Sequence, residues 1–184
     1  MDTELEQVLD DGFLDGHESL DADRLRAMRQ RCQKVETSLS YLRRLAQGRI
    51  DIVSAELDRR QEGGDPLDLD ELVARLPAVL SDRTRSSHLG PMPQVLAPGR
   101  IEGRLADELA GMEFDAHLSA LPDVSVEWLR STRDRLVDYE HRVSQLRRAL
   151  FDRIDTLGAE LGRRYRDGAA DIDAVIGGAR REDA

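Results

Sequence analysis

The fold is decided by two stretches of equal length, LRAMRQRCQKVETSLSYLRRLAQGRIDIVSAELDRR at residues 25–60 and LRSTRDRLVDYEHRVSQLRRALFDRIDTLGAELGRR at residues 129–164. Apolar residues recur in each at alternating steps of three and four, with single longer steps across Arg49, Thr132 and Arg153. This spacing is typical of coiled-coil helices, whose apolar stripe is buried only against a partner. The pattern therefore predicts a pair of long helices with a common seam: Leu25, Met28, Cys32, Val35, Leu39, Leu42, Ala46 and Val53 from the first, and Leu129, Leu136, Tyr139, Val143, Leu146, Leu150 and Leu157 from the second.

Capping and breaking residues set the expected bounds of these helices. Asp21 is a suitable N-cap and Gly63 follows the first pattern, so the first helix is expected over about residues 21–60. The second helix follows Pro122 and is expected over about residues 125–166, before Gly168. One or two short helices, at residues 69–80 and about 101–112, are expected in the linker at 61–124, around a Pro- and Gly-rich stretch at 86–100 that cannot continue a helix.

These elements predict an all-α fold in which a helical hairpin domain covers residues 21–168. The first 20 residues are acidic, with scattered apolar side chains, and are expected to form a flexible arm. Residues 169–184 contain two adjacent glycines and end in charged residues, and are expected to form a flexible tail.

The composition of the 184-residue chain excludes several classes of protein. Charged residues make up 35% and aromatic residues 4%, which rules out a thick aromatic core. The net charge of −10 argues against direct DNA binding through a basic surface. The single cysteine cannot form an intramolecular disulfide bond. The sequence has no stretch near the roughly 20 apolar residues of a membrane span and no signal-like N-terminus, so we expect a cytoplasmic protein without a membrane partner.

The two long stretches are copies of each other. With an offset of 104 residues, 17 of the 36 aligned positions are identical without a gap. Amphipathic repetition explains the shared leucines and much of the shared arginine. It explains less well a polar set with one fixed spacing, which is Glu36, Ser40, Arg43, Gln47 and Asp51 in the first copy and Glu140, Ser144, Arg147, Phe151 and Asp155 in the second.

Helix geometry places each polar set on one stripe. At about 100° per residue the five positions fall within about 80°, on the flank of the apolar seam. Because equivalent flanks meet only in an antiparallel pair, the two copies form a single two-fold surface only if the helices are antiparallel. The linker of 64 residues permits this arrangement and does not compel it.

A two-fold surface of arginines, carboxylates and hydroxyls suits a small, two-fold symmetric anion that carries purine bases. Arginine donates to the O6 and N7 atoms of guanine, and a carboxylate accepts from the N1 and N2 donors on its other edge. Serine and neighbouring arginines can donate to phosphate oxygens. The residues by themselves leave the particular nucleotide open.

The repeated spacing of Glu, Ser, Arg, Gln and Asp resembles that of the RsiG-type anti-sigma factors of actinobacteria. The resemblance implies an antiparallel coiled coil whose duplicated motif binds a cyclic di-GMP dimer, so that the liganded form sequesters the sporulation sigma factor WhiG. It implies nucleotide ligands at Glu36, Ser40, Arg43, Gln47, Asp51, Glu140, Ser144, Arg147 and Asp155, with Arg44 and Arg148 as further candidates for phosphate contacts. Phe151 departs from the pattern, because the first copy has Gln47 at that position.

Two other functions compete with this prediction. A coiled-coil scaffold or dimerisation protein without a nucleotide ligand would explain the charged stripes as solvated flanks. An enzyme is disfavoured, because no nucleophile has a histidine base at motif spacing and an open helical flank does not exclude water. We therefore predict a non-enzymatic binding protein.

Overall fold

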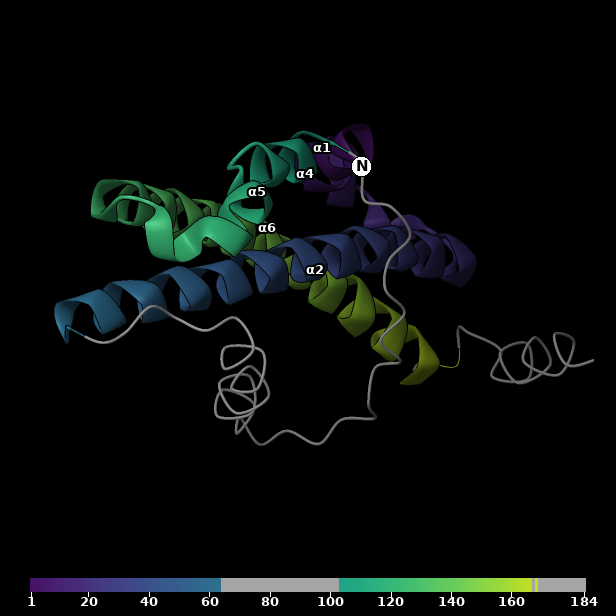
Figure 1. The fold of residues 1–184 in the computed structure, drawn as a ribbon. Coiled ribbons are helices and arrows are strands. Elements are labelled where there is room, and N and C mark those ends of the chain that lie inside the picture. The colour runs from purple at the N-terminus through teal and green to yellow at the C-terminus, as the bar shows by residue number, and fades with distance from the viewer. Residues whose placement is uncertain (64–102, 167, 169–184) are drawn as a thin grey trace, which may run out of the picture. The chain divides into compact units, whose positions relative to one another are not determined.

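The computed structural model describes residues 1–63, 103–166 and 168 (Figure 1). Every regular element in these ranges is a helix, which confirms the all-α prediction. Two of the helices are long: α2 spans Ala22–Gln61 and α6 spans Val126–Arg166. The short helix predicted at 69–80, the Pro- and Gly-rich stretch at 86–100 and the predicted tail at 169–184 lie outside the described residues.

Both long helices begin at side chains that cap them. The Asp21 carboxylate accepts a hydrogen bond from the backbone N–H of Arg24 at 2.8 Å, and the Ser125 hydroxyl accepts one from the N–H of Trp128 at 3.1 Å. After α2 the backbone of Gly63 has a φ of 70°, a left-handed conformation that glycine adopts without a steric cost. The observed bounds lie within one residue of the predicted ones because these caps are encoded locally.

The chain divides into two compact units, and both long helices contribute to each. Unit 1 comprises Met1–Ser40 and Val143–Ala184, and unit 2 comprises Tyr41–Arg142. Unit 1 therefore contains the first part of α2 and the second part of α6. Unit 2 contains the second part of α2, the first part of α6 and the short helices α4 (Arg104–Ala110), α5 (Phe114–His117) and η3 (Leu118–Asp123).

The helices are antiparallel within each unit. In unit 1, Arg26 near the start of α2 donates to the hydroxyl of Tyr165 near the end of α6 at 2.5 Å, whereas residue 36 pairs with residue 147. In unit 2, residue 43 pairs with residue 140, and Arg60 at the end of α2 donates to the carbonyl of Val124 just before α6 at 2.7 Å. In each unit the residue number of the partner in or before α6 falls as the residue number in α2 rises. This order confirms the predicted antiparallel pairing of the two helices.

The predicted seam residues form the core of the pairs. All are buried except Met28 and Leu146, which are half-buried. Of the three positions that interrupt the apolar spacing, Thr132 and Arg49 are buried, at 2% and 6% exposed, and Arg153 is half-buried. In the part of the chain that the structure describes, no helix has the length and apolar character needed to cross a lipid bilayer.

Cys32 and Tyr139 belong to this seam, as predicted. Burial raises the pKa of the Cys32 thiol, and burial together with the nearby Glu108 carboxylate raises the pKa of Tyr139 to about 12. The Tyr139 hydroxyl donates to the carbonyl of Leu105 at 3.0 Å, so its polar end has a partner in α4. Both side chains are neutral core residues at physiological pH.

Residues 1–20 differ from the predicted flexible arm. They form α1 (Asp2–Leu9) and two short 3-10 helices, η1 (Asp11–Leu14) and η2 (His17–Ser19). Val8 is fully buried in unit 1, and the carbonyl of Leu9 accepts a hydrogen bond from Arg153 at 2.8 Å. One buried apolar side chain and partnered backbone groups outweigh the acidic composition on which the prediction rested.

In unit 2, Arg49 holds the short helices α4 and α5, which precede α6 as α1 precedes α2 in unit 1. Its guanidinium donates to the carbonyl of Leu109 at 2.8 Å and to the carboxylate of Asp115 at 2.5 Å, and lies 5.4 Å from the centroid of the Phe114 ring. Arg49 and Arg153 occupy the same position in the two copies. The structural repeat therefore extends beyond the sequence repeat: in each copy a short helical segment precedes the long helix and is held by an arginine of the other copy.

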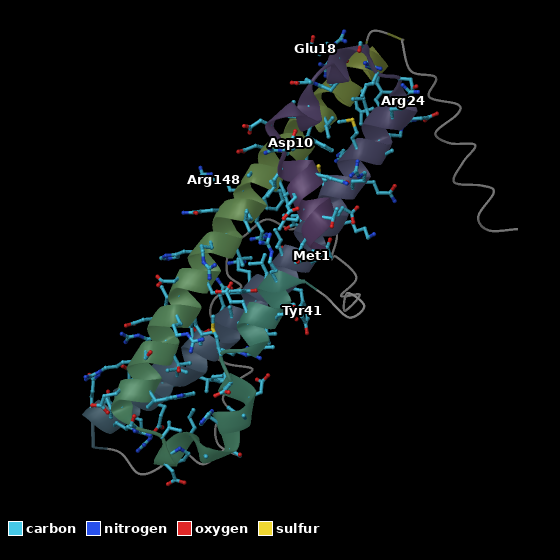
Figure 2. The ribbon with its side chains drawn as sticks, turned by 90° about the horizontal axis from the view of Figure 1, so that it is seen from above. Met1, Asp10, Glu18, Arg24, Tyr41 and Arg148 are labelled. Atoms are coloured by element: carbon cyan, nitrogen blue, oxygen red, sulfur yellow. The ribbon has the colours of Figure 1, made fainter. Side chains whose placement is uncertain are left out.

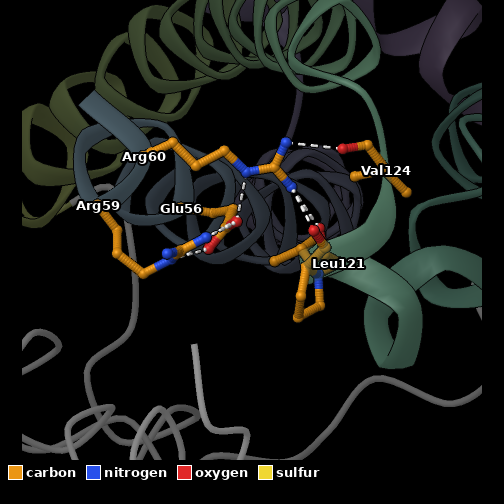
Figure 3. A network of polar contacts seen from close by, with 6 residues as sticks. Glu56, Arg59, Arg60, Leu121 and Val124 are labelled. Atoms are coloured by element: carbon orange, nitrogen blue, oxygen red, sulfur yellow. Dashed lines mark hydrogen bonds and ion pairs between the residues drawn. The ribbon is translucent and has the colours of Figure 1, made fainter. Parts of the chain in front are cut away.

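A buried carboxylate anchors the end of α2 in unit 2 (Figure 3). The Glu56 side chain is 0% exposed and accepts hydrogen bonds of 2.6–2.7 Å from Arg59 and Arg60. Arg60 in turn donates to the carbonyls of Leu121 and Val124 at 2.8 and 2.7 Å. Burial alone raises the pKa of the Glu56 carboxyl, but the hydrogen bonds from the two arginines outweigh it and lower the pKa below its usual value.

Glu160 repeats this arrangement in unit 1. Hydrogen bonds from Arg163 and Arg164 lower the pKa of its carboxyl to about 2, and Arg164 also donates to the carbonyl of Leu20. Because the pKa is depressed in the folded state, the ionised group stabilises the protein at pH values above about 4.3, the usual pKa of an unfolded glutamate. This contribution is lost as the pH falls from there towards 2.

We therefore expect the wild-type protein to lose more stability between pH 5 and pH 3 than a Glu160→Gln variant, which has no proton to bind at this site. Urea unfolding followed by circular dichroism at a series of pH values measures the difference. Parallel pH profiles for the two proteins would show that this carboxylate does not contribute to acid sensitivity.

Candidate ligand-binding site

The motif residues lie in two half-sites, one in each unit, because the boundary between the units cuts both copies of the motif. Half-site 1 is in unit 1 and contains Glu36 and Ser40 from α2 with Ser144, Arg147, Phe151 and Asp155 from α6. Half-site 2 is in unit 2 and contains Arg43, Gln47 and Asp51 from α2 with Glu140 from α6. Each half-site thus combines residues of both copies.

In half-site 1, the Glu36 carboxylate is the common acceptor. Its Oε1 atom accepts from the Ser40 hydroxyl one turn later at 2.5 Å. The same atom accepts from Nε and Nη2 of Arg147 at 3.1 and 2.9 Å. The side chains of Glu36 and Arg147 are 17% and 18% exposed, so the ion pair is partly shielded from water and held at a fixed position.

In half-site 2, the Glu140 carboxylate plays the equivalent role. Its Oε1 atom lies 3.4 Å from Nη1 of Arg43 and accepts a hydrogen bond from the side-chain amide of Gln47 at 3.1 Å. Glu140 is 15% exposed and Arg43 is 27% exposed. In both half-sites the motif arginine of one copy therefore binds the motif glutamate of the other copy.

The remaining predicted ligands are distributed over the same helices. Ser144 in half-site 1 and Asp51 in half-site 2 are half-buried, and Asp155 is exposed. The two further candidates, Arg44 and Arg148, are also exposed. Figure 2 shows the Arg148 side chain directed outward from α6. Of the predicted ligand set, Asp155, Arg44 and Arg148 are therefore exposed, and the other residues are half-buried.

A small pocket lies at half-site 2 and includes residues that sequence reasoning missed. Its volume is about 170 Å³, and Gln47, Ile50, Val137, Glu140 and His141 line it. His141 directly follows Glu140 in the sequence but is not one of the positions of the repeated motif. Val137 lies one turn before Glu140 on α6, and His141 directly follows it. This closeness to Glu140 is the signal in the sequence that could identify both residues.

Phe151 has an unusual environment for an aromatic side chain. It is 42% exposed, and the guanidinium carbon of Arg147 lies 5.3 Å from the centroid of its ring. This distance is within the range of a cation–π interaction. Phe151 therefore adds an exposed aromatic face to half-site 1, at the position where half-site 2 has an amide.

The fold and the half-sites define an all-helical protein with a duplicated, crossed Arg/Glu motif. A sequence model of the RsiG-like family matches residues 11–80 and 115–177, so the chain belongs to this family. The family is one of anti-sigma factors, which gives this chain a general anti-sigma role and a sigma factor as its partner, and it is not a family of enzymes. A search of curated proteins found no match.

Proposed function

We propose that this anti-sigma factor binds cyclic di-GMP through its two half-sites, and that the liganded protein sequesters a WhiG-type sporulation sigma factor and so represses the transcription that depends on it. The observation that carries the proposal is the crossed pairing of Arg43 with Glu140 and of Arg147 with Glu36. Each unit holds one such Arg/Glu pair, and a guanine nucleotide offers matching acceptors and donors to each pair.

The chemistry of each half-site suits a guanine base. The arginine supplies donors for O6 and N7 on one edge of guanine, and the glutamate supplies an acceptor for N1 and N2 on the other. An arginine has five N–H donors, and the contacts of Arg147 with Glu36 use two of its nitrogens. The glutamate therefore orients the guanidinium without saturating it, and further donors remain for the base or a phosphate.

The phosphates of the ligand need positive groups at the outer edge of each half-site. Arg44 and Arg148 are exposed and directly follow the motif arginines, so we assign them phosphate contacts. A local cluster of arginines is required because the protein as a whole carries a net charge of −10, which repels a free anion. Affinity for the nucleotide should accordingly fall as the salt concentration rises.

Isothermal titration calorimetry tests the proposal directly. Cyclic di-GMP is titrated into the chain alone and into the chain mixed with a WhiG-type sigma factor. We expect saturable heat in at least one of the two titrations. Cyclic di-AMP is the matched control, because it has the same charge but its adenine lacks O6 and the N2 amine. A coiled-coil scaffold would give no heat with either nucleotide in either titration.

A further inference from the structure

Phe151 occupies the centre of the polar stripe on α6. At about 100° per residue it lies within about 40° of each of the four motif residues on that helix. The other two large apolar side chains that are exposed in the described residues, Tyr41 and Leu45, are on α2 and point at least about 80° away from the stripe of that helix. Phe151 is therefore the exposed aromatic group that shares a helix face with the proposed ligands.

The position tolerates an aromatic residue because half-site 1 satisfies its carboxylate without an amide. In half-site 2, Gln47 donates to Glu140 at 3.1 Å. In half-site 1, Glu36 instead accepts from Ser40 at 2.5 Å and from two nitrogens of Arg147. The residue at position 151 is thus not needed as a donor, and its side chain is available for another kind of contact.

Arg147 fixes the ring in a defined place. The guanidinium lies 5.3 Å from the ring centroid and is itself held by Glu36 at 2.9 Å. A purine base gains affinity when it stacks on an aromatic side chain, because any base has a π-face to cover the ring. A base that binds the donors of Arg147 would be within reach of the exposed ring next to it.

We propose that Phe151 is a base-stacking residue of half-site 1, which makes the two half-sites chemically different: half-site 1 adds stacking on Phe151 to the hydrogen bonds of Arg147 and Glu36, whereas half-site 2 adds the amide of Gln47 to those of Arg43 and Glu140. This inference rests on the proposed binding of cyclic di-GMP. Stacking gains little from the identity of the base, so Phe151 adds affinity to half-site 1 with little discrimination of guanine from adenine.

Nuclear magnetic resonance of the phenylalanine rings tests the inference. The chain has three phenylalanines, so ring-labelled protein gives three sets of signals, and the set that disappears in a Phe151→Leu variant belongs to this residue. Under the conditions in which calorimetry detects binding to the wild-type protein, cyclic di-GMP should shift the Phe151 signals. The guanine H8 proton should move upfield and show a nuclear Overhauser effect to the ring.

Affinity measurements on variants give a second readout. We expect Phe151→Leu to weaken cyclic di-GMP binding about tenfold, and Phe151→Tyr to restore it, because tyrosine keeps a π-face. Leu45→Ala is the matched control: it removes an apolar side chain of similar exposure, 38%, and should not change affinity.

The outcomes separate the inference from the proposed function. Wild-type binding with unshifted Phe151 signals and unchanged affinity in Phe151→Leu would overturn the stacking role and leave cyclic di-GMP binding intact. Absence of any wild-type binding, alone and with the sigma factor, would overturn both. Circular dichroism of the variants confirms that a loss of affinity does not come from unfolding.

Discussion

Replacing Arg147 or Arg43 with alanine is expected to weaken cyclic di-GMP binding by about 10- to 100-fold, because a bidentate contact of arginine with guanine contributes about 1–3 kcal/mol. Each substitution removes the guanidinium donors of one half-site and leaves the negative charge of Glu36 or Glu140 without that arginine, which disfavours an anionic ligand. The helices should stay folded, since both arginines are partly exposed, at 18% and 27%. Calorimetric titration of the single variants measures the effect.

Arg135→Ala is the matched control for these variants. Arg135 is an exposed arginine of α6 that lies about 140° around the helix from Glu140. Its removal changes the net charge by the same amount as the motif variants do. We expect its affinity for the nucleotide to stay within about twofold of the wild-type value. Unchanged affinity in both motif variants, or an equal loss in the control, would remove the roles assigned to the motif arginines.

Glu56→Ala is expected to lower the free energy of unfolding by about 3 kcal/mol, because removal of one partner from a buried ion pair leaves the other without compensation. The Glu56 side chain is 0% exposed and binds Arg59 and Arg60, which are 17% and 18% exposed. Arg60 would then lose the group that orients it towards the carbonyls before α6. Urea unfolding followed by circular dichroism measures the change.

Asp58→Ala provides the comparison for this variant. Asp58 lies two residues further along α2 and is exposed, so its removal should change the free energy of unfolding by no more than about 0.5 kcal/mol. Equal unfolding midpoints for Glu56→Ala and the wild type would mean that the network in Figure 3 does not stabilise unit 2.

The long helices and their buried faces could be predicted from the sequence because they depend on local signals, whereas the linker leaves the antiparallel pairing open and the family resemblance implies it. A seam of apolar residues at steps of three and four specifies the helices and their buried face, and Asp21 fixes where α2 begins. The sequence repeat also identifies residues that the structure brings together, such as Arg43 with Glu140 and Arg147 with Glu36.

α4 lies within the short helix predicted at about 101–112, but the helical structure of residues 1–20 and the contacts that hold the short segments could not be predicted, because those contacts join residues distant in the sequence. α1 is fixed by the burial of Val8 and by Arg153, which is 144 residues away from Leu9. Arg49 and Arg153 looked like interruptions of the seam, whereas their side chains bind the carbonyls that these segments present. No pattern of local hydrophobicity encodes such a contact, although their shared position in the repeat marks them as equivalent.

One pull-down tests the proposed binding of cyclic di-GMP and the proposed capture of a WhiG-type sigma factor together. The chain is immobilised and incubated with the sigma factor, with and without cyclic di-GMP, beside an Arg43→Ala/Arg147→Ala double variant. We predict that the nucleotide increases the amount of sigma factor retained by the wild-type chain and has no effect on the double variant. Equal retention by the wild-type chain with and without the nucleotide would contradict the claim that cyclic di-GMP controls this anti-sigma factor.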